Sequence, residues 1–442
     1  MFQKILIANR GEIAVRVIRA CRELGIQTVA VYSEADKNAL HTMLADEAVC
    51  IGPASPAESY LNMENILSAT VASKADAIHP GFGFLSENAR FAELCEKCNI
   101  KFIGPSSKVI SAMGDKASAR KTMKNAGVPV TPGSDDAVIV AAEGKKIADE
   151  IGYPVIIKAS AGGGGKGMRV VEKAKDFEEL FSIAQTEAVN AFGDGSMYVE
   201  KYITRARHIE VQILEDKFGN VISLGERDCS IQRKHQKLIE EAPAAALSEK
   251  MRKKMSEAAV LAAKACGYEN AGTIEFLVPD EHNFYFMEMN TRLQVEHSIT
   301  EEVTGIDIVK EQIKIAAGEE LSYKQKDIKI NGHAIECRIN AEDAEKNFRP
   351  CPGKINESFL PAGKGVRIEH CIYPGFEVLP FYDSMLLKLI VHDNTRSEAI
   401  HKMQSALGEL IIDGITTTQD FLYDIVHEEN YVAGVFDTGY LS

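Results

Sequence analysis

The clearest alternation of polar and apolar positions in the chain lies between Phe286 and His297. Every second residue there has a side chain that can bind a metal, bind an anion or accept a proton: Glu288, Asn290, Arg292, Gln294 and Glu296. Successive side chains of an extended chain point to opposite faces, so all five are expected on one face. Met287 and Met289 occupy the other face. The pattern predicts an extended segment with one chemically capable side.

A strand predicted at residues 272–278 precedes this segment and forms a hairpin with it. A four-residue loop at 280–283 places Glu275 directly opposite Glu288. Opposed residues have Cβ atoms roughly 5 Å apart, so the two carboxylates repel each other unless a cation lies between them. With the amide oxygen of Asn290 they form a set of hard ligands suited to Mg²⁺ or Mn²⁺. We prefer this interpretation to a solvated polar face, because the opposite face is strongly apolar.

The N-terminal pattern predicts a parallel α/β unit. Apolar strands at 5–8 and 28–32 flank a helix that has apolar residues at helical spacing from Ile13 to Leu24. The turn before this helix contains only Gly11 and no G-x-G-x-x-G, so the dinucleotide-binding fingerprint is missing. We therefore interpret this part as mainly a scaffold.

Four consecutive glycines at 162–165 lie between strands predicted at 154–158 and 169–171. Glycines cost conformational entropy that a structural hairpin would not need, but their backbone N–H groups can approach phosphate oxygens. The loop is not a Walker A motif, because no Ser or Thr follows Lys166 and no helix begins there. We interpret it as a flexible phosphate lid; an exposed flexible loop is the alternative.

Helical periodicity and short strands organise the remaining chain. Residues 106–126 are predicted to be mostly helical, further helices are predicted at 248–266, 306–317 and 397–410, and a short tail follows the last of them. An antiparallel sheet is predicted between residues 331 and 391. Its first strand carries Glu336, Arg338 and Asn340 on one face.

Composition is that of an ordinary soluble globular protein. The 442 residues suggest two to four domains, with 45% hydrophobic and 26% charged residues. A net charge of −14 argues against nucleic-acid binding, which requires a basic face. Nine cysteines with scattered spacing fit the reducing cytoplasm. The sequence has no apolar run of membrane-spanning length and no apolar leader, so neither a membrane span nor a signal peptide is predicted.

With these motifs in place, the sequence resembles biotin carboxylase, a family of the ATP-grasp superfamily. The resemblance runs from Ile7 to Ile415, nearly the whole chain. It is carried by His79-Pro80-Gly81, the glycine loop, and the motifs at 227–233 (RDCSIQR), 288–292 (EMNTR), 294–297 (QVEH) and 336–338 (ECR). Two positions depart from the family pattern, which has Tyr in place of Phe82 and Pro in place of Ser298.

The resemblance implies an α/β fold, α+β in parts. The implied architecture is an ATP-grasp fold with an N-terminal Rossmann-like parallel-sheet domain and a C-terminal antiparallel-sheet domain. The implied domains are residues 1–114, 115–330 and 331–442, and the second carries a mobile glycine-rich lid at 131–203. ATP would lie between two antiparallel sheets.

The resemblance also implies a residue set for each ligand. Contacts to the phosphates and adenine of ATP would come from Lys116, Lys158, Gly164, Gly165, Glu200, Lys201, Tyr202, Ile203, His208 and His235. The magnesium or manganese ligands would be Glu275, Glu288 and Asn290. Bicarbonate would meet Lys237, Arg292, the Val295 backbone and Arg338, and Glu296 would be its general base.

The implied reaction is the ATP- and bicarbonate-dependent carboxylation of biotin through carboxyphosphate. Glu296 accepts a proton only while ionised, which Arg292 and Arg338 favour, and Arg338 would stabilise the enolate-like oxygen of biotin. No biotinylation segment is recognised, so biotin is expected on a biotin carboxyl carrier protein.

Separate carboxyltransferase subunits would use the product and select the final acceptor, whether acetyl-CoA, propionyl-CoA, pyruvate or another acid. The family also implies a homodimer. Two alternatives stay open: another ATP-grasp ligase that makes an acyl phosphate for an amine, and a catalytically silent nucleotide sensor.

Overall fold

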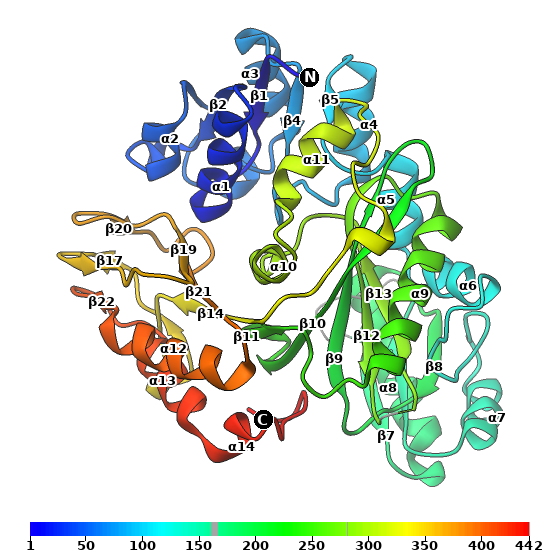
Figure 1. Cartoon of the computed structure of the whole chain (residues 1–442). Helices are drawn as coiled ribbons and strands as arrows, with labels where there is room; N and C mark the ends of the chain where they lie inside the picture. Colours follow the sequence, from blue (N-terminus) through cyan, green and yellow to red (C-terminus); the bar gives the residue numbers. More distant parts are fainter. Residues whose placement is uncertain (161–166, 281, 442) are drawn as a thin grey trace.

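The structure is a computed structural model that describes residues 1–160, 167–280 and 282–441. Figure 1 shows an N-terminal part at the top, a central part on the right and a C-terminal part at the lower left. A single large sheet runs from the central part into the C-terminal part.

A five-stranded parallel sheet forms the N-terminal part, in the order β3-β2-β1-β4-β5. Its strands are β1 (Lys4–Ile7), β2 (Gln27–Tyr32), β3 (Glu47–Cys50), β4 (Ala77–His79) and β5 (Lys101–Phe102). Its helices are α1 (Gly11–Glu23), α2 (Leu40–Leu44), α3 (Met63–Ser73) and α4 (Ala89–Lys97). Ile5 and Ile7 pack on the side of α1, whereas Leu6 packs on the side of α3 and α4. Helices therefore cover both faces, which confirms the predicted Rossmann-like sheet.

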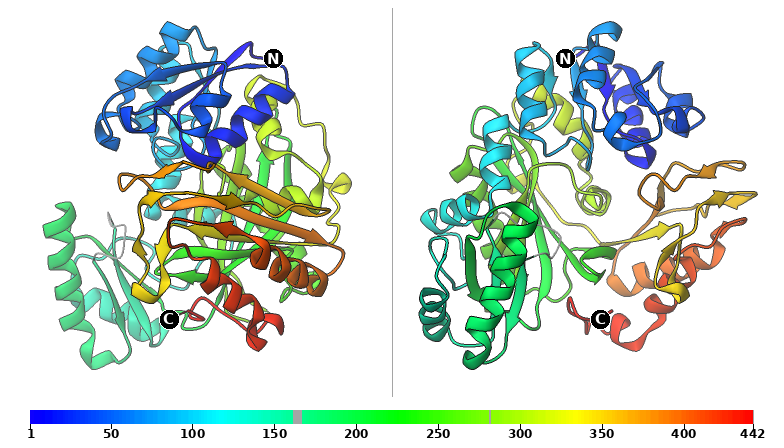
Figure 2. Two further views of the ribbon diagram at one scale, coloured as in Figure 1. Left: turned by 90° about the vertical axis from the view of Figure 1, so that its left-hand side faces the viewer. Right: turned by 180° about the vertical axis from the view of Figure 1, so that it is seen from behind.

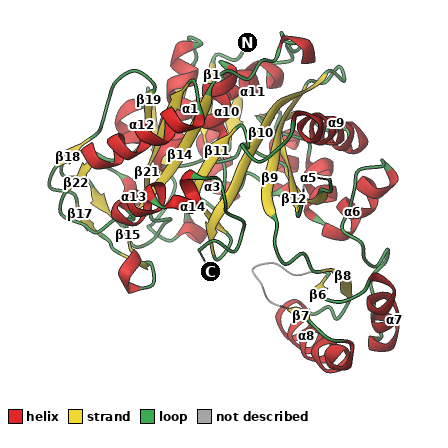
Figure 3. Ribbon diagram, turned by 60° about the horizontal axis from the view of Figure 1, so that its bottom comes forward, coloured by secondary structure: helices red, strands yellow, loops and turns green. Residues whose placement is uncertain are grey.

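A small antiparallel sheet with its own core forms the lobe between residues 131 and 203. The sheet has the order β7-β6-β8, and its elements are α7 (Ala141–Ile151), β6 (Val155–Ala159), β7 (Met168–Val171), α8 (Phe177–Phe192) and β8 (Met197–Lys201). Phe177 and Phe181 of α8 pack on Val155 and Ile157 of β6. Figure 3 shows this lobe set apart from the rest of the chain. The glycine loop at 162–165 lies outside the described residues.

The large sheet has eight antiparallel strands in the order β13-β12-β9-β10-β11-β14-β21-β19. Their bounds are β9 (Arg207–Glu215), β10 (Val221–Arg233), β11 (Gln236–Ala242), β12 (Asn270–Val278), β13 (Tyr285–Asn290), β14 (His333–Asn340), β19 (Val366–His370) and β21 (Met385–Asp393). Because β11 pairs with β14, the sheet passes without interruption from the central part into the C-terminal part.

Helices cover both faces of this sheet. They are α5 (Ser107–Gly114), α6 (Lys116–Asn125), α9 (Glu249–Cys266), α10 (His297–Thr304), α11 (Ile308–Ala316), α12 (Arg396–Glu409), α13 (Gln419–His427) and α14 (Glu429–Val432). Three short two-stranded sheets, β15-β16, β17-β20 and β18-β22, complete the C-terminal part. Their strands are β15 (Glu342–Asp343), β16 (Arg349–Pro350), β17 (Gly353–Lys354), β18 (Ser358–Phe359), β20 (Glu377–Val378) and β22 (Ile411–Ile412). Figure 2 (left) shows the orange strands of this part between the blue N-terminal part and the red C-terminal helices.

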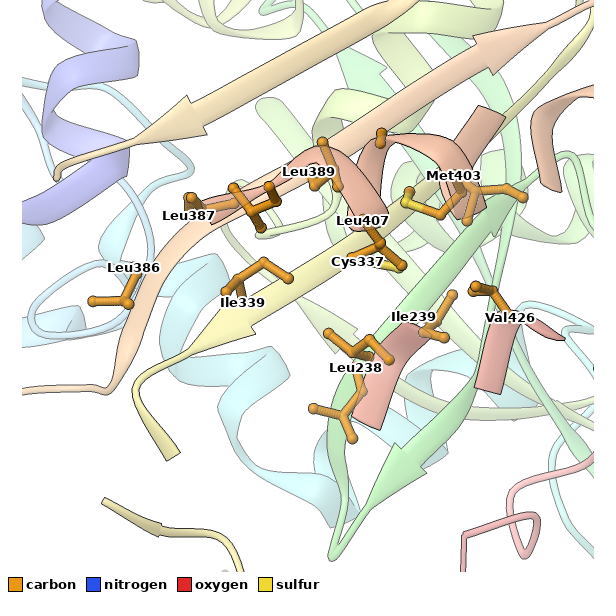
Figure 4. Close-up of a cluster of buried hydrophobic side chains, with 14 of the residues drawn as sticks. Leu238, Ile239, Cys337, Ile339, Leu386, Leu387, Leu389, Met403, Leu407 and Val426 are labelled. Atoms are coloured by element: carbon orange, nitrogen blue, oxygen red, sulfur yellow. The ribbon is translucent and has the colours of Figure 1, made fainter. Parts of the chain in front are cut away.

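Alternating side chains divide the sheet into an apolar face and a polar face. In the C-terminal half, Cys337, Leu387 and Leu389 pack with Met403 and Leu407 of α12, as Figure 4 shows. In the central half, alternate residues of β9 and β12 pack on α9. The opposite face carries charged residues and α10, and the candidate site lies there.

One expectation for the helices is wrong. The chain after residue 410 is not only a short tail, because α13 and α14 form there and bury Leu422 and Tyr431 against the C-terminal core. Residues 106–126 are mostly helical, as predicted, and they form two helices, because Asp115 ends α5 and caps α6 with a hydrogen bond from the Ser118 amide.

Two further observations concern the cysteines and the length of the helices. All nine cysteines are free thiols. None of the helices in the described ranges combines the length and apolar character needed to cross a membrane.

Glu241 in β11 binds side chains from β14 and from α12 in the C-terminal part. Its carboxylate accepts hydrogen bonds from Arg396 at 2.7 and 2.9 Å and lies 2.9 Å from His333 Nε2. Burial raises the pKa of this carboxyl, but His333 and Arg396 outweigh burial and lower it from 4.5 to about 2.

Glu241→Gln is expected to reduce the free energy of unfolding at neutral pH by roughly 3 kcal/mol, the linkage value of this pKa difference. A lowered folded-state pKa stabilises the protein above the unfolded pKa, and this stabilisation is lost as the pH falls toward 2. Denaturant unfolding at pH 7, 5 and 3 should therefore show the two proteins converging. Glu357→Gln, at an exposed position, is the control; a difference for Glu241→Gln that stays constant with pH would contradict the assignment.

Candidate active site

The predicted acidic pair is present in the β12–β13 hairpin. Glu275 is directly opposed to Glu288. Next to the turn, however, the pairing is displaced by one residue, since Leu277 opposes Tyr285. A bulge between Glu275 and Phe276 restores the predicted register. The assumed four-residue loop is therefore wrong for the turn, while the opposed pair is confirmed.

The extended segment predicted as far as His297 ends at Asn290. Residues 291–296 form an irregular turn, and α10 begins at His297 with Glu296 as its N-cap residue. The turn folds back on the hairpin, because Arg292 Nη2 donates to Asn290 Oδ1 at 3.1 Å and Gln294 donates to Glu275 at 3.4 Å. The polar residues thus reach one site by chain reversal and not by a shared strand face.

A buried ammonium surrounded by carboxylates lies at the centre of the site. Lys237 Nζ of β11 is 2.7 Å from Glu210, 2.9 Å from Glu275 and 2.7 Å from Glu296. Burial disfavours the charged lysine, but these carboxylates outweigh it and raise the pKa of Lys237 well above its ordinary value. Burial also raises the pKa of Glu275. Lys237 and His208 lower this pKa by more than burial raises it, so the carboxylate stays ionised.

Glu296 is held between two cations. Its second oxygen is 2.9 Å from Arg338 Nη2, and the Arg338 Nε donates to Glu240 at 2.6 Å. Burial raises the pKa of Glu296, but Lys237, Arg338 and Arg227 together lower it well below its ordinary value. Glu296 is therefore ionised at neutral pH and able to accept a proton.

The sequence predicted no role for Arg227 or Glu210. In the structure Glu210 contacts both Lys237 and Arg227. Arg227 in β10 is wholly buried, pairs with Glu210 of β9, and donates to Gln212, Thr300 and Thr273 at 2.8, 2.9 and 3.2 Å. The signal was present in the sequence, since β9 carries polar residues at every second position of an otherwise apolar strand.

The N-terminal part also contributes a residue that was missed. Glu87, in the loop after β4, accepts hydrogen bonds from the Thr291 amide at 3.0 Å and from Arg292 Nε at 2.9 Å. Arg292 also donates to Gln294 at 3.0 Å. Its guanidinium is thus fixed at the edge of the site by groups other than Glu296.

The donor set fits a hard divalent cation. Burial and the neighbouring Glu275 both raise the pKa of Glu288, which is the repulsion that a bound cation would relieve. Asn290 directs its Nδ2 to Glu275 at 2.8 Å and its Oδ1 to Arg292, so its oxygen would join the carboxylates after a half-turn of the amide. Among the described His, Cys, Asp and Glu residues, two groups of three have ligand atoms within 4.8 Å of one another, His208-Glu210-Glu275 and Glu210-Cys229-Glu296, and neither includes Glu288.

The expected nucleotide-binding residues fall in two places. Lys158 of β6 and Glu200 of β8 pair across neighbouring strands at 2.6 Å, and Lys201 donates to the carbonyls of Gly152 and Tyr153 at 3.0 Å. Next to them, the Tyr202 amide donates to Pro154, and Ile203 is half-buried.

The other expected nucleotide contacts lie nearer the large sheet. His208 Nε2 is 2.8 Å from Glu275, so it lies in the acidic cluster. His235 is exposed at the tip of the β10–β11 hairpin with a φ of 65°. Lys116 opens α6, where its charge favours the ionised forms of both Glu200 and Glu288. Gly164 and Gly165 lie outside the described residues.

A small antiparallel sheet carrying lysines, a large antiparallel sheet carrying an acidic pair, and a parallel N-terminal sheet together define the ATP-grasp class of enzymes. Family models cover the chain in three segments: "Biotin carboxylase, N-terminal domain" at 1–110, "Carbamoyl-phosphate synthase L chain, ATP binding domain" at 115–324, and "Biotin carboxylase C-terminal domain" at 336–442. The chain belongs to the biotin carboxylase family, which confirms the resemblance seen in the sequence.

Individual relatives agree over the full length. Biotin carboxylase 1 of Bacillus subtilis is 57% identical over 100% of this chain and 98% of its own. The structure of a biotin carboxylase complex with beta-gamma-ATP from Campylobacter jejuni is 56% identical, with a TM-score of 0.95 over 100% of this chain and 98% of that one.

A third relative was solved with more than one ligand. It is the biotin carboxylase domain dimer of the Hydrogenobacter thermophilus 2-oxoglutarate carboxylase, in complex with MgADP, ADP and bicarbonate. It is 52% identical, with a TM-score of 0.93 over 100% of this chain and 97% of that one. The chain is thus an ATP-dependent ligase whose family carboxylates biotin with bicarbonate.

Proposed function

We propose that this chain carboxylates biotin held on a separate carrier protein, through carboxyphosphate, with Glu296 as the general base. One observation carries the proposal: an ionised carboxylate lies between Lys237 and Arg338 on the same polar face as the acidic pair Glu275–Glu288. An ATP-grasp ligase that activates a carboxylic acid for an amine would need the acidic pair, but not this second set of charges.

Bicarbonate binds among the cations next to Glu296. Lys237, Arg292 and Arg338 neutralise its charge, and the Val295 backbone N–H donates to it. Bicarbonate is a poor nucleophile toward an anionic triphosphate, so neutralisation is needed before the two can approach. The guanidinium groups suit this role because they stay charged and offer several oriented donors.

Entry of bicarbonate also adjusts the strength of the base. In the unliganded arrangement the pKa of Glu296 is lowered by Lys237, Arg338 and Arg227, which makes it ionised but weakly basic. An anion placed among the same cations shares their charge and raises the pKa of Glu296 toward the working pH. Glu296 can then take the bicarbonate proton as the oxygen attacks the γ-phosphate.

ATP lies between the lobe at 131–203 and the large sheet. Lys116, Lys158, Gly164 and Gly165 bind its phosphates, and adenine binds at residues 200–203, with His208 and His235 nearby. Glu275, Glu288 and Asn290 would hold Mg²⁺ or Mn²⁺, which would neutralise the transferred phosphoryl group.

Carboxyphosphate then decomposes beside biotin. Carbon dioxide and phosphate separate, the phosphate takes the proton from the ureido nitrogen, and that nitrogen attacks carbon dioxide. Arg338 stabilises the enolate-like oxygen that forms on biotin when the proton leaves.

Three structural units and several partners belong to this proposal. The units are residues 1–114, 115–330 and 331–442. The partners are a biotin carboxyl carrier protein, carboxyltransferase subunits and a second copy of the chain. Support for the second copy comes from the Hydrogenobacter relative, which was solved as a dimer. The final carboxyl acceptor is chosen by the carboxyltransferase.

Steady-state ADP release tests the proposal directly. The purified chain with MgATP should release ADP faster when both bicarbonate and free biotin are present than when either is omitted. An ADP release rate that is the same with and without both compounds would refute biotin carboxylation.

Glu296→Gln is expected to lower biotin-dependent turnover by about 10²-fold or more, since the amide cannot accept the proton. ATP binding, measured by calorimetry, should be largely unchanged. Glu302→Gln is the matched control, because Glu302 lies on the same helix and pairs with Arg367 away from Lys237. Turnover retained in Glu296→Gln would show that another group is the base.

Glu288→Gln is expected to raise the Mg²⁺ concentration needed for half-maximal turnover by about tenfold or more, the size of effect seen on perturbing metal sites. The substitution removes one anionic ligand of the metal. It also removes the repulsion between Glu288 and Glu275, which a bound cation would relieve and which therefore favours metal binding. Glu257→Gln, on the outer side of α9, provides the control. Unchanged activity at ordinary Mg²⁺ concentrations would place the metal elsewhere.

A further inference from the structure

Lys388 in β21 is a buried cation that the steps above do not use. Its side chain is wholly buried, and the next residue on its face, Ile390, packs against α10. The Nζ atom lies 2.5 Å from the carbonyl oxygen of Val295 and 3.1 Å from the Oγ of Ser298. Burying an ammonium is costly unless it is well partnered. Val295 lies in the turn that presents Glu296, and Ser298 lies in the first turn of α10, directly after it.

Two cations on neighbouring strands hold this turn at different points. Lys388 and Arg338 are directly opposed in the β14–β21 pair, so their side chains lie on the same face. Like charges in this position repel each other. The turn lies between them: Arg338 binds the Glu296 carboxylate at 2.9 Å, and Lys388 binds the carbonyl of the preceding residue. Figure 1 shows α10, which follows this turn, at the centre between the N-terminal part and these strands.

Glu296 depends on such an anchor because it does not cap its own helix. It is the N-cap residue of α10, yet its side chain makes no capping hydrogen bond within the described part of the chain. A capping side chain ordinarily fixes the first turn of a helix. Here the carboxylate is directed to Lys237 and Arg338, so the main chain must be held by other groups. Lys388 supplies that hold at Val295 and Ser298.

The hydrogen bonds of Lys388 go to Val295 and Ser298, while its charge also favours the ionised forms of Glu12, Glu336 and Glu369. Its nearest carboxylate is Glu12 of α1, at 3.6 Å, which is longer than a hydrogen bond. Burial raises the pKa of Glu12 to about 7, against the lowering effect of Lys388. Neither oxygen of Glu12 has a hydrogen-bond partner among the described residues. The short hydrogen bonds of Lys388 are thus those to Val295 and Ser298.

We propose that Lys388 is a positioning residue for the bicarbonate end of the site. By binding the Val295 carbonyl, it turns the negative end of that peptide group away from the incoming anion. By holding Val295 and Ser298, it also keeps Glu296 between Lys237 and Arg338. The inference rests on the proposed function, because it requires that bicarbonate meet Val295 and Glu296.

Lys388→Met is the direct test, made in the full chain with biotin carboxylation as the assay. The value of kcat/KM for bicarbonate is expected to fall about tenfold or more, since small displacements of reacting groups have effects of this size. The KM for ATP should stay within about twofold of wild type, because the nucleotide contacts come from other elements. A merely structural role would move both parameters together.

Lys402→Met is the matched control. Lys402 also donates to a main-chain carbonyl, that of His392 at 2.7 Å, but on α12 and away from the site. Its substitution should leave both parameters at the wild-type value. Ser298→Ala, which removes only one acceptor, should lower kcat/KM for bicarbonate less than Lys388→Met does.

Two results would overturn the inference: a kcat/KM for bicarbonate in Lys388→Met within about twofold of wild type, or an equal rise in the KM values of ATP and bicarbonate. If Lys388→Met does not fold, Lys388→Gln replaces it, since glutamine keeps a hydrogen-bond donor without the charge. The same result is required of it: a lower kcat/KM for bicarbonate with an unchanged KM for ATP. Failure of the proposed function is distinguishable, because wild type itself would then lack bicarbonate- and biotin-dependent turnover.

Discussion

The contact of Lys237 with three carboxylates is the interaction on which the rest of the site depends. Glu210, Glu275 and Glu296 come from β9, β12 and the turn before α10, and each lies within 2.9 Å of the same ammonium. Without a cation, buried carboxylates this close could not all stay ionised. Arg227 and Arg338 extend the same compensation on either side. The polar face of the sheet can therefore be both buried and charged, which is the state that a base and a metal ligand require.

The sequence predicted those parts of this arrangement that depend on local periodicity. The Glu275–Glu288 pair follows from the period of two in neighbouring strands joined by a short connection. The two residues are opposed although the predicted loop length was wrong, because a bulge shifts the register of the strands by one residue. The strand at His333–Asn340 likewise has the shared face of Glu336 and Arg338 that its alternation predicted. The parallel N-terminal sheet was predictable because its strands and helices alternate in sequence.

Other parts could not be predicted, because distant residues decide them. The alternation from Glu288 to Glu296 is compatible with a strand and with a folded turn. The turn forms because Glu87 binds Thr291 and Arg292 across a sequence separation of more than two hundred residues. The alternation of β9 marks Glu210 as part of a polar face, but its contact with Arg227 depends on the pairing of β9 with β10, which no local pattern specifies. The cap at Asp115 was a local signal that the helical periodicity on both sides concealed.

The two ends of the site therefore differ in how they are built. The acidic pair belongs to one hairpin and needs only β12 and β13 to form. The turn at 291–296 is held by Glu87 from the N-terminal part, by Lys237 from the central part, and by Arg338 and Lys388 from the C-terminal part. The proposed bicarbonate end is thus complete only when all three parts are docked together. It follows that changes in the packing between these parts, even far from the reacting atoms, should act on bicarbonate use before they act on the metal.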